Sequence, residues 1–452
     1  MYRKEQMYEM IQWAIDTAAP YPVHVVITGS AEGLTRFANS EIHQNVFEDQ
    51  TKLQVILFDQ RKKSSVTTNM ITCEGVTNAV KEAKENLVFL PEGEMVPDLV
   101  ELPMFLEQER LDKELAVEFS AEQRALRLAE QLKYIEYPYK AFGQLSYAEE
   151  VVVIGNSKGI RRYYRGNQVQ CNVLVSHENG ASGYAAGVSH KAGELNLKTL
   201  FDTAFQKAKM NQNPITLPVG AYTVVLEPQA VFNLMMYTSF LGFSAKSIQQ
   251  KMSFLTDRLG EKLFDEKITI KDDWEDPNAL GLPFDMEGTP RSKLTLIDRG
   301  IAKEVAYDLE TAAKESRAST GHSVGMGFFA GAIPVNMVIE PGQKTLEQII
   351  AETEEGLLVT RFHYMNPVNP RQALLTGLTR DGFYKIEKGQ IVAAVANMRM
   401  TESMLKALNQ VEEISSDGQS ISAFIGTVHM PAMKIREFHF TGQTGLKEPG
   451  KI

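Results

Sequence analysis

The sequence contains few cysteines and no pair of closely spaced histidines. Its two cysteines, Cys73 and Cys171, are far apart, which excludes a Cys-x-x-Cys zinc site. None of the eight histidines stands three, four or five residues from another, the spacing that places two imidazoles on one helix face. His177 precedes Glu178, but the glycine-rich segment that follows favours a strand end over a metal-binding helix. The sequence thus has no motif for a transition-metal site.

The sequence also lacks a basic excess and long apolar runs. A formal net charge of -10 and a pI near 5.5 argue against broad nucleic-acid binding, which requires a basic face. No run approaches the roughly 18 apolar residues of a membrane-spanning helix. Two cysteines in so long a chain, and an N-terminal segment without the apolar core of a signal peptide, predict a reducing compartment. We therefore expect a cytoplasmic protein that binds neither nucleic acid nor membrane.

The remaining composition is that of a globular protein with two or three domains. Hydrophobic residues make up 43% and charged residues 23% of 452 positions. Residues 5–19 and 75–90 have helical periodicity and flank four strand-like runs, which predicts a helix, an antiparallel meander and a helix. A second series of strand-like runs follows the capping pair Ser120 and Gln123. The predicted domains are an N-terminal α+β unit (1–90), a connector (91–119), a second α+β unit (120–213) and a β-rich domain (214–452).

The two α+β units show a limited match in sequence. A shift of 126 residues aligns four residues of the first unit with four of the second: Gly29, Gly33, Arg36 and Gln44 with Gly155, Gly159, Arg162 and Gln170. A shared turn, in which the glycines adopt positive φ before an arginine-bearing strand, would explain this match. The hypothesis is that the two units arose by duplication.

The C-terminal part contains many strand-like runs separated by glycine turns. They include residues 222–226, 294–298, 356–361 and 376–386. Such a series is typical of a large antiparallel or barrel-like domain. The predicted fold class is therefore α+β, with helix–meander–helix units followed by a barrel-like C-terminal domain.

Three segments resemble the TldD/PmbA family, once described as modulators of DNA gyrase: VVLEPQAVFNLMMYTSFL (224–241), TRFANSEIHQN (35–45) and SFLTDRLGEKL (253–263). In the catalytic branch of that family, the helix after the first strand carries a His-Glu-x-x-x-His zinc motif, and a further cysteine ligand lies near the C-terminus. Here no cysteine follows Cys171, and the motif positions hold Phe232, Asn233, Leu234, Met235, Met236 and Tyr237. The resemblance therefore points to the metal-free branch, called PmbA or TldE.

The resemblance implies a subunit that works with a partner. It predicts no catalytic residue, no metal ligand and no bound cofactor in this chain, with zinc in a TldD-like partner subunit. The pair would form a metallopeptidase that acts on peptides or unfolded segments. The alternative is a non-enzymatic homodimer of the same fold that binds peptides or a regulatory partner. Autonomous hydrolysis with serine or aspartate groups is a third hypothesis, but no paired-carboxylate motif supports it.

Five polar residues are candidates for contacts with a peptide or a partner. Arg36 and Asn39 belong to a polar cluster near a strand, which could equally be a hairpin whose turn is closed by Asn39 and Ser40. Arg317, Thr320 and His322 lie in or next to the segment STGHSVGMG (319–327), which the family resemblance places beside a central cavity. A histidine in such a glycine-rich segment is also typical of a hydrogen-bonded turn.

Two further segments have a structural interpretation. The acidic segment KDDWEDPNALGLPFDMEG (271–288) could attract a hard cation, but its prolines and irregular spacing favour a solvated loop. The helix predicted after Pro228 is apolar on more than one side, which is typical of a buried helix. One face of this helix could instead contribute to a subunit interface.

Overall fold

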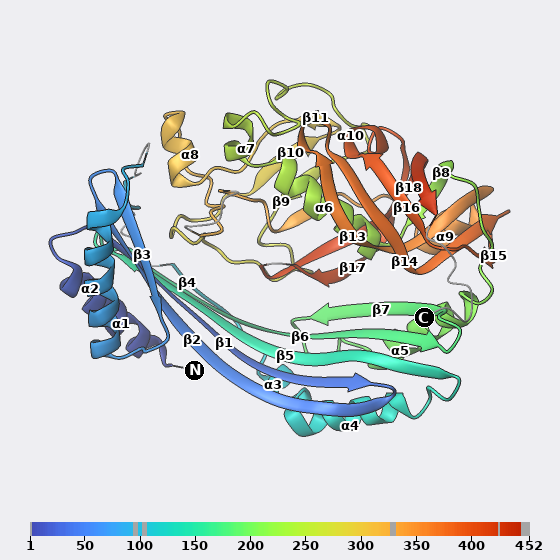
Figure 1. Cartoon of the computed structure of the whole chain (residues 1–452), viewed down its shortest axis with the longest axis horizontal. Helices are drawn as coiled ribbons and strands as arrows, with labels where there is room; N and C mark the ends of the chain where they lie inside the picture. The colour runs from blue at the N-terminus through green and yellow to red at the C-terminus, as the bar shows by residue number, and fades with distance from the viewer. Residues whose placement is uncertain (1, 94–97, 102–105, 326–330, 424, 444–452) are drawn as a thin grey trace.

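The computed structural model describes residues 2–93, 98–101, 106–325, 331–423 and 425–443. Figure 1 shows two layers, in which a long, curved N-terminal sheet lies beneath a β-rich C-terminal part. The predicted α+β class is confirmed. None of the described helices is both long and apolar enough to span a membrane.

The N-terminal sheet is a single sheet of seven strands. Its order is β3-β2-β1-β5-β6-β4, with β7 paired to β6. Because β1 pairs antiparallel with β5 from His24 to Phe37, the segments predicted as two α+β units share one sheet. The strands are β1 (Val23–Ala38), β2 (Glu41–Asp59), β3 (Lys62–Thr68), β4 (Leu106–Arg110), β5 (Tyr139–Asn156), β6 (Arg161–His177) and β7 (Ser182–Ser189).

Side-chain alternation gives the two faces of this sheet different roles. Val23, Val25 and Ile27 pack against α1 (Lys4–Ala18) and α2 (Cys73–Phe89). Phe37, at the far end of β1, packs with residues of α3 (Lys113–Glu118), α4 (Ala121–Leu132) and α5 (Leu197–Met210). The alternate residues of β1, beginning with His24 and Val26, point to the opposite face of the sheet, towards the C-terminal part. The helices therefore cover the outer face and leave the inner face for the second layer.

The glycine turn proposed for the duplication is wrong. Gly29 and Gly33 lie inside β1, and of the four aligned glycines only Gly159 has a positive φ, at 91°. Gly33 serves close packing instead, because a Cβ there would lie 2.4 Å from Nη1 of Arg124. Arg124 is buried, and its guanidinium donates to Thr35 Oγ1 and to the carbonyl oxygen of Phe119. The aligned residues of the two units therefore have different local structures.

The segment predicted as a connector contributes to the sheet. β4 pairs in parallel with β6, and α3 follows directly, with Asp112 accepting hydrogen bonds from the backbone N–H groups of Glu114 and Leu115. Residues 94–97 and 102–105 of this segment lie outside the described residues.

The C-terminal sheet is ring-like. Its order is β13-β8-β18-β16-β14-β15, and an additional β13–β14 pairing closes five of these strands into a ring, in agreement with the barrel-like prediction. The strands are β8 (Gly220–Leu226), β13 (Glu355–Asn369), β14 (Leu374–Glu387), β15 (Gln390–Ala394), β16 (Met398–Ser403) and β18 (Thr427–Gln443), with β17 (Val411–Ser422) paired to β18.

A smaller sheet and several helices complete this part. The sheet contains β11 (Ile301–Ala302), β10 (Leu294–Asp298), β9 (Ile270–Asp272) and β12 (Met337–Ile339), in that order. The helices are α6 (Pro228–Gly242), α7 (Ala245–Gln249), α8 (Leu309–Lys314), α9 (Leu346–Ala351) and α10 (Met404–Ala407), with a 3-10 turn at Pro370–Gln372. The ring, the smaller sheet and the helices α6, α7, α8 and α10 share the largest hydrophobic cluster of the described residues, whereas Ile349 of α9 belongs to a separate cluster.

Candidate functional site

Helix α6 lies in the hydrophobic core of the C-terminal part. Pro228 occupies its first turn, where the missing N–H is not needed, and the Glu227 N–H donates to the carbonyl oxygen of Val359 on β13. Eight of its residues are buried, on more than one side of the helix. The prediction of a core helix is confirmed, whereas a contribution to a subunit interface stays a prediction.

The six positions that the family resemblance matches to the zinc motif contribute to packing. Leu234 and Met235 are buried in the core. The Asn233 side-chain oxygen accepts a hydrogen bond from the Phe362 N–H, and the Tyr237 hydroxyl donates to the carbonyl oxygen of Met365. Both polar groups thus tie α6 to β13. Among the described residues, no group of three or more histidine, cysteine, aspartate or glutamate side chains could hold a metal ion.

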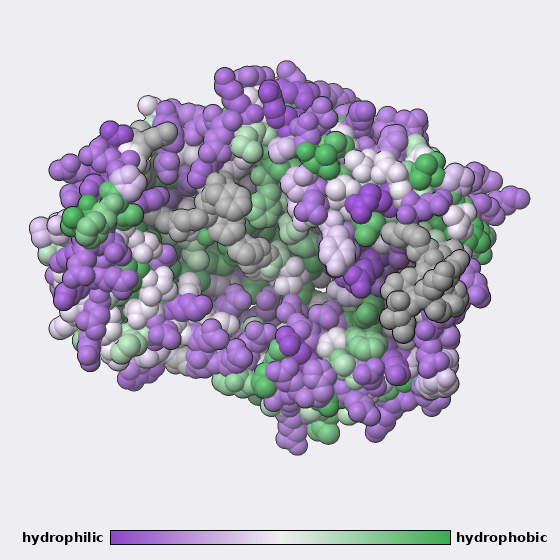
Figure 2. Space-filling model, in the orientation of Figure 1, coloured by the Kyte–Doolittle hydropathy of each residue, from purple (hydrophilic) through white to green (hydrophobic). Residues whose placement is uncertain are grey.

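A groove runs past the start of α6, between the two layers. It comprises a cavity of about 470 Å³ and a neighbouring one of about 190 Å³, which share Tyr184, Ala186, Gln229 and Gln419. We call this combined space the α6 groove. Figure 2 shows that the molecule is hollowed between its two layers. Its lining residues come mainly from β6, β7 and α5 on the N-terminal side and from α6, α9 and β17 on the C-terminal side.

Strand β7 presents one edge to this groove. Among the described strands it pairs with β6 alone, so its other edge carries no ladder of backbone hydrogen bonds. Two carbonyl oxygens on that edge are occupied by side-chain amides instead. Asn211 Nδ2 donates to Ser182, and Gln419 Nε2 donates to Ala186. The backbone groups of alternate residues in a strand point to the same edge. The N–H and carbonyl oxygen of Tyr184 therefore also face this edge, between these two positions.

Charged and aromatic groups join the layers around the groove. Lys207 of α5 and Glu227, at the start of α6, form an ion pair whose side chains are only 13% and 14% exposed. The Arg361 guanidinium lies 3.9 Å from the ring centre of Tyr184, and burial raises the pKa of this tyrosine. Arg361 also pairs with Asp381, whose carboxylate accepts a hydrogen bond from the Ser182 hydroxyl. These contacts therefore join α5 and β7 to the C-terminal part beside the groove.

The predicted contact residues Arg36 and Asn39 lie on a hairpin. Asn39 and Ser40 have φ of 52° and 63° and close the turn between β1 and β2, so the hairpin interpretation is confirmed. Arg36 is paired in register with Gln44, and Ser40 Oγ accepts a hydrogen bond from the Ala141 N–H. Arg36 and Asn39 are exposed, and neither lines the α6 groove.

The other predicted contact residues, Arg317, Thr320 and His322, gather around Tyr307. Arg317 donates to the Tyr307 hydroxyl, while the Thr320 hydroxyl contacts both the N–H and the carbonyl oxygen of Tyr307. His322 is fully buried, with Nδ1 2.9 Å from Thr320 Oγ1 and Nε2 3.2 Å from Asp272 Oδ1. Of the segment that contains Thr320 and His322, residues 326 and 327 lie outside the described residues.

The order Asp272, His322, Thr320 is that of an acid, a base and a hydroxyl nucleophile. Its geometry is nevertheless structural, because the threonine hydroxyl is held by backbone groups and the histidine has no exposed surface. Burial alone would raise the pKa of Asp272, but His322 and Arg291 hold it below its usual value. These residues stabilise the loops of the C-terminal part.

The interpretation of the acidic segment as a solvated loop is wrong for three of its carboxylates. Asp272, Asp285 and Glu287 are buried, whereas Glu275 is exposed. Asp285 accepts hydrogen bonds from the N–H groups of Glu287, Thr289 and Ser323.

The sequence did not predict the α6 groove, because its walls come from segments that only the fold brings together.

Comparisons with known proteins place the chain in a family. Residues 219–442 match the model of the PmbA/TldA metallopeptidase C-terminal domain. An uncharacterized protein of Methanocaldococcus jannaschii is 36% identical over 194 residues, which are 42% of this chain and 46% of that protein. A metalloprotease TldD homolog of Buchnera aphidicola is 27% identical over 206 residues, 42% of each chain. The chain thus spans about half the length of the curated relatives it matches.

A solved structure extends the likeness to the whole fold. The crystal structure of TldE from Thermococcus kodakarensis superposes with a TM-score of 0.85 at 20% identity, covering 97% of this chain and 100% of that one. This likeness concerns the fold, and the matched C-terminal domain provides the evolutionary link. The chain is a member of the PmbA/TldD family.

Proposed function

We propose that this chain is a metal-free, TldE/PmbA-like subunit of a cytoplasmic zinc metallopeptidase that acts on peptides or unfolded segments. The observation that carries the proposal is the use of Asn233 and Tyr237 in helix α6. At the positions of the family's zinc motif, both polar side chains bind backbone groups of β13. The residues present do not fit zinc, because an amide and a phenol already engaged in hydrogen bonds, with thioether and hydrocarbon neighbours, are not its ligands.

The α6 groove is the part of the chain suited to a peptide. An extended segment can add to an unpaired strand edge through backbone hydrogen bonds, which do not depend on the side chains of the segment. The edge of β7 faces the groove, and the amides of Asn211 and Gln419 occupy two of its carbonyl oxygens. A peptide N–H would take the same position as the Gln419 amide. The groove therefore supports binding of unfolded segments with little sequence preference.

The role of the chain in catalysis would be to hold and enclose the substrate. In this proposal a TldD-like partner supplies the zinc and performs peptide-bond hydrolysis. The ion pair Lys207–Glu227, the Arg361–Tyr184 contact and the Ser182–Asp381 hydrogen bond join the two layers beside the groove. A rigid wall of this kind admits an extended chain and excludes a folded protein.

The test combines metal analysis with a cleavage assay. The purified chain is measured for zinc by mass spectrometry, alone and after mixing with a TldD-like protein, and each sample is assayed on an unfolded peptide. We expect no stoichiometric zinc and no cleavage by the chain alone, and cleavage in the mixture. A mixture whose TldD-like partner has the motif glutamate changed to glutamine is the control, and it should be inactive.

Two results would contradict the proposal. One is tightly bound zinc in the isolated chain together with cleavage that a chelator abolishes. The other is a stable homodimer that binds peptides and neither associates with nor activates the TldD-like protein. The second result would establish the non-enzymatic alternative.

A further inference from the structure

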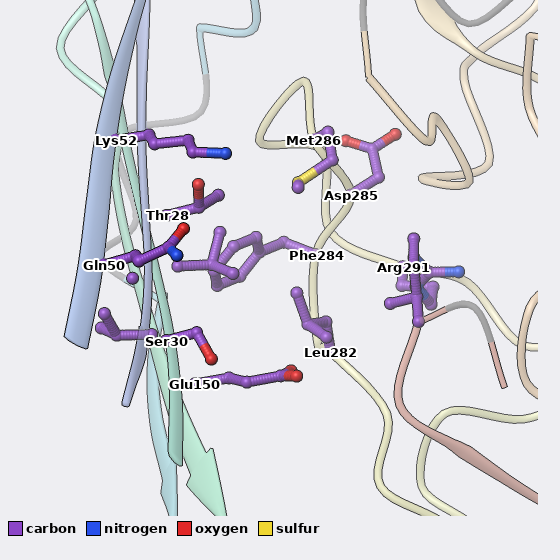
Figure 3. Close-up of a pocket in the computed structure, with 14 residues that line it drawn as sticks. Thr28, Ser30, Gln50, Lys52, Glu150, Leu282, Phe284, Asp285, Met286 and Arg291 are labelled. Atoms are coloured by element: carbon purple, nitrogen blue, oxygen red, sulfur yellow. The ribbon is translucent and has the colours of Figure 1, made fainter. Parts of the chain in front are cut away.

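A second cavity lies between the layers and shares no lining residue with the α6 groove. Its volume is about 290 Å³, and it separates β1, β2 and β5 from the loop 282–291 of the C-terminal part. Figure 3 shows the side chains of the sheet on one side and those of the loop on the other. We call it the sheet–loop pocket. It is lined by Thr28, Gly29, Ser30, Gln50, Lys52, Glu150, Val151, Val152, Leu282, Phe284, Asp285, Met286, Arg291 and Ile425.

The strand register sets the sheet side of this pocket. Lys52, Thr28 and Val152 are direct neighbours across β2, β1 and β5, and so are Gln50, Ser30 and Glu150 one row further along. Because alternate residues share a face, both rows point towards the loop. The side chains of Lys52 and Glu150 reach from the sheet into the space before it (Figure 3). A cation and a carboxylate thus stand on opposite outer strands of a three-strand floor.

The loop side is apolar and firmly attached. Leu282 and Phe284 pack with Val152 and other residues of the inner sheet face in one hydrophobic cluster. His24 Nε2 donates to the carbonyl oxygen of Met286 at 3.0 Å, and Arg162 Nε donates to that of Gly288. The pocket is therefore preformed, with an apolar wall opposite a polar floor.

The charges around the pocket balance. Lys52 and Arg291 are opposed by Glu150 and Asp285. Asp285 is satisfied by three backbone N–H groups, but Lys52 and Glu150 form no ion pair within the part of the chain that the structure describes. Arg291 is 6% exposed, and its Nε and Nη1 have no hydrogen-bond partner among the described residues. A pocket with unused groups of both signs and no net charge complements a ligand that also carries both.

The length of the floor indicates the size of such a ligand. Neighbouring strands lie about 4.8 Å apart, so β2 and β5 are separated by about 10 Å. An extended peptide spans roughly 3.3–3.6 Å per residue, so two or three residues bridge this distance. Glu150 is exposed on the sheet surface, yet desolvation by neighbouring groups and the charge of Glu32 raise the pKa of its carboxyl group, and a nearby ammonium group would stabilise its charged form.

We propose that the sheet–loop pocket binds a free peptide of two or three residues, with its ammonium group at Glu150, its carboxylate at Lys52 and its apolar side chains against Leu282 and Phe284. The proposed function supplies the source of such peptides, which are products of peptide cleavage, and the inference rests on it in this respect. Binding itself requires neither the partner nor turnover. A failure of this inference is therefore distinguishable from a failure of the proposed function.

The test is calorimetric titration of the purified chain with three probes: the tripeptide Leu-Ala-Leu, its N-acetyl derivative and its C-terminal amide. We expect saturable binding of the free tripeptide and at least about tenfold weaker binding of each blocked form, because each loses one charged hydrogen bond. The variants Lys52→Met and Glu150→Gln should each weaken binding of the free tripeptide to a similar extent. Both residues lie on the sheet surface, and unchanged urea midpoints would show that the variants are folded.

The controls for this test are substitutions at positions outside the pocket. Lys133→Met and Glu41→Gln remove exposed charges outside the pocket, so both variants should bind the tripeptide like the wild type. Absence of saturable binding, or equal binding of the three probes, would overturn the inference. If only one blocked terminus weakens binding, the pocket recognises a single charge and the assignment to a zwitterionic peptide is wrong.

Discussion

The α6 groove and the sheet–loop pocket both lie between the same two layers, but they are closed by different forces. Side-chain amides and ion pairs border the groove, and water or a peptide can replace each amide contact at little cost. The pocket is closed by Phe284 and its apolar neighbours, which lose contact area if the layers part. One joint of the molecule therefore suits exchange of ligands along a strand, while the other holds the layers together.

The largest effect is expected at the apolar joint. Phe284→Ala removes a fully buried ring from the cluster between the layers and should lower the free energy of unfolding by about 3–5 kcal/mol. Urea titration measures this loss. Phe47→Ala is the matched control, since Phe47 is 64% exposed and its truncation should change stability by less than about 0.5 kcal/mol. Equal effects of the two substitutions would show that Phe284 does not bind the layers together.

A smaller effect is expected from acidification, through His24 at the same joint. Burial lowers the pKa of His24 to about 4, so the folded protein keeps the ring neutral while the unfolded chain takes up a proton below about pH 6.5. This contribution is intact above pH 6.5 and is lost as the pH falls from there towards 4. Between pH 7.5 and pH 5 it amounts to about 2 kcal/mol.

The measurement is the unfolding free energy of wild type and His24→Gln at both pH values. The amide of glutamine can still donate to Met286 but does not titrate, so the variant should lose about 2 kcal/mol less than the wild type on acidification. His43→Gln, at an exposed position, should retain the wild-type dependence. If His24→Gln and the wild type show the same pH dependence, His24 is not the group responsible.

The smallest effect is expected in the groove. Gln419→Ala removes the amide that occupies the Ala186 carbonyl oxygen, and a bound peptide N–H no longer competes with it. Affinity for an unfolded peptide should rise by a factor of about 2–10, the equivalent of one ordinary hydrogen bond. Fluorescence anisotropy with a labelled peptide measures this change, with Gln131→Ala on α4 as the control. A loss of affinity would mean that Gln419 binds the peptide instead of reserving its place.

Local patterns were sufficient to predict most elements but not their full lengths. The strand at residues 294–298 has the predicted ends, because turns bound its apolar residues closely. In contrast, β1 continues through Gly29, Ser30 and Glu32, which are poor strand formers by themselves. It does so because β2 and β5 supply hydrogen bonds on both sides. The pairing with β5 depends on residues more than 100 positions away, which local periodicity does not report.

The site was predicted in part for a similar reason. The apolar character of α6 is visible in the sequence and correctly predicted a buried helix. The pairing of His322 with Asp272 was missed, because the amino-acid sequence alone does not distinguish a buried aspartate from a solvated one. The two cavities were missed as well, since Gln229 and Gln419, or Lys52 and Phe284, meet only in the folded chain.

The guanidinium of Arg124 lies over the bare backbone of Gly33, and because of this contact we expect the two distant positions to change together in evolution. A side chain at position 33 would displace the arginine from Thr35 and from the end of α3, leaving its charge buried without those partners. Homologous chains that carry a larger residue at this point of β1 should therefore carry a shorter, uncharged residue at the corresponding point of α4. The two substitutions should rarely be inherited separately.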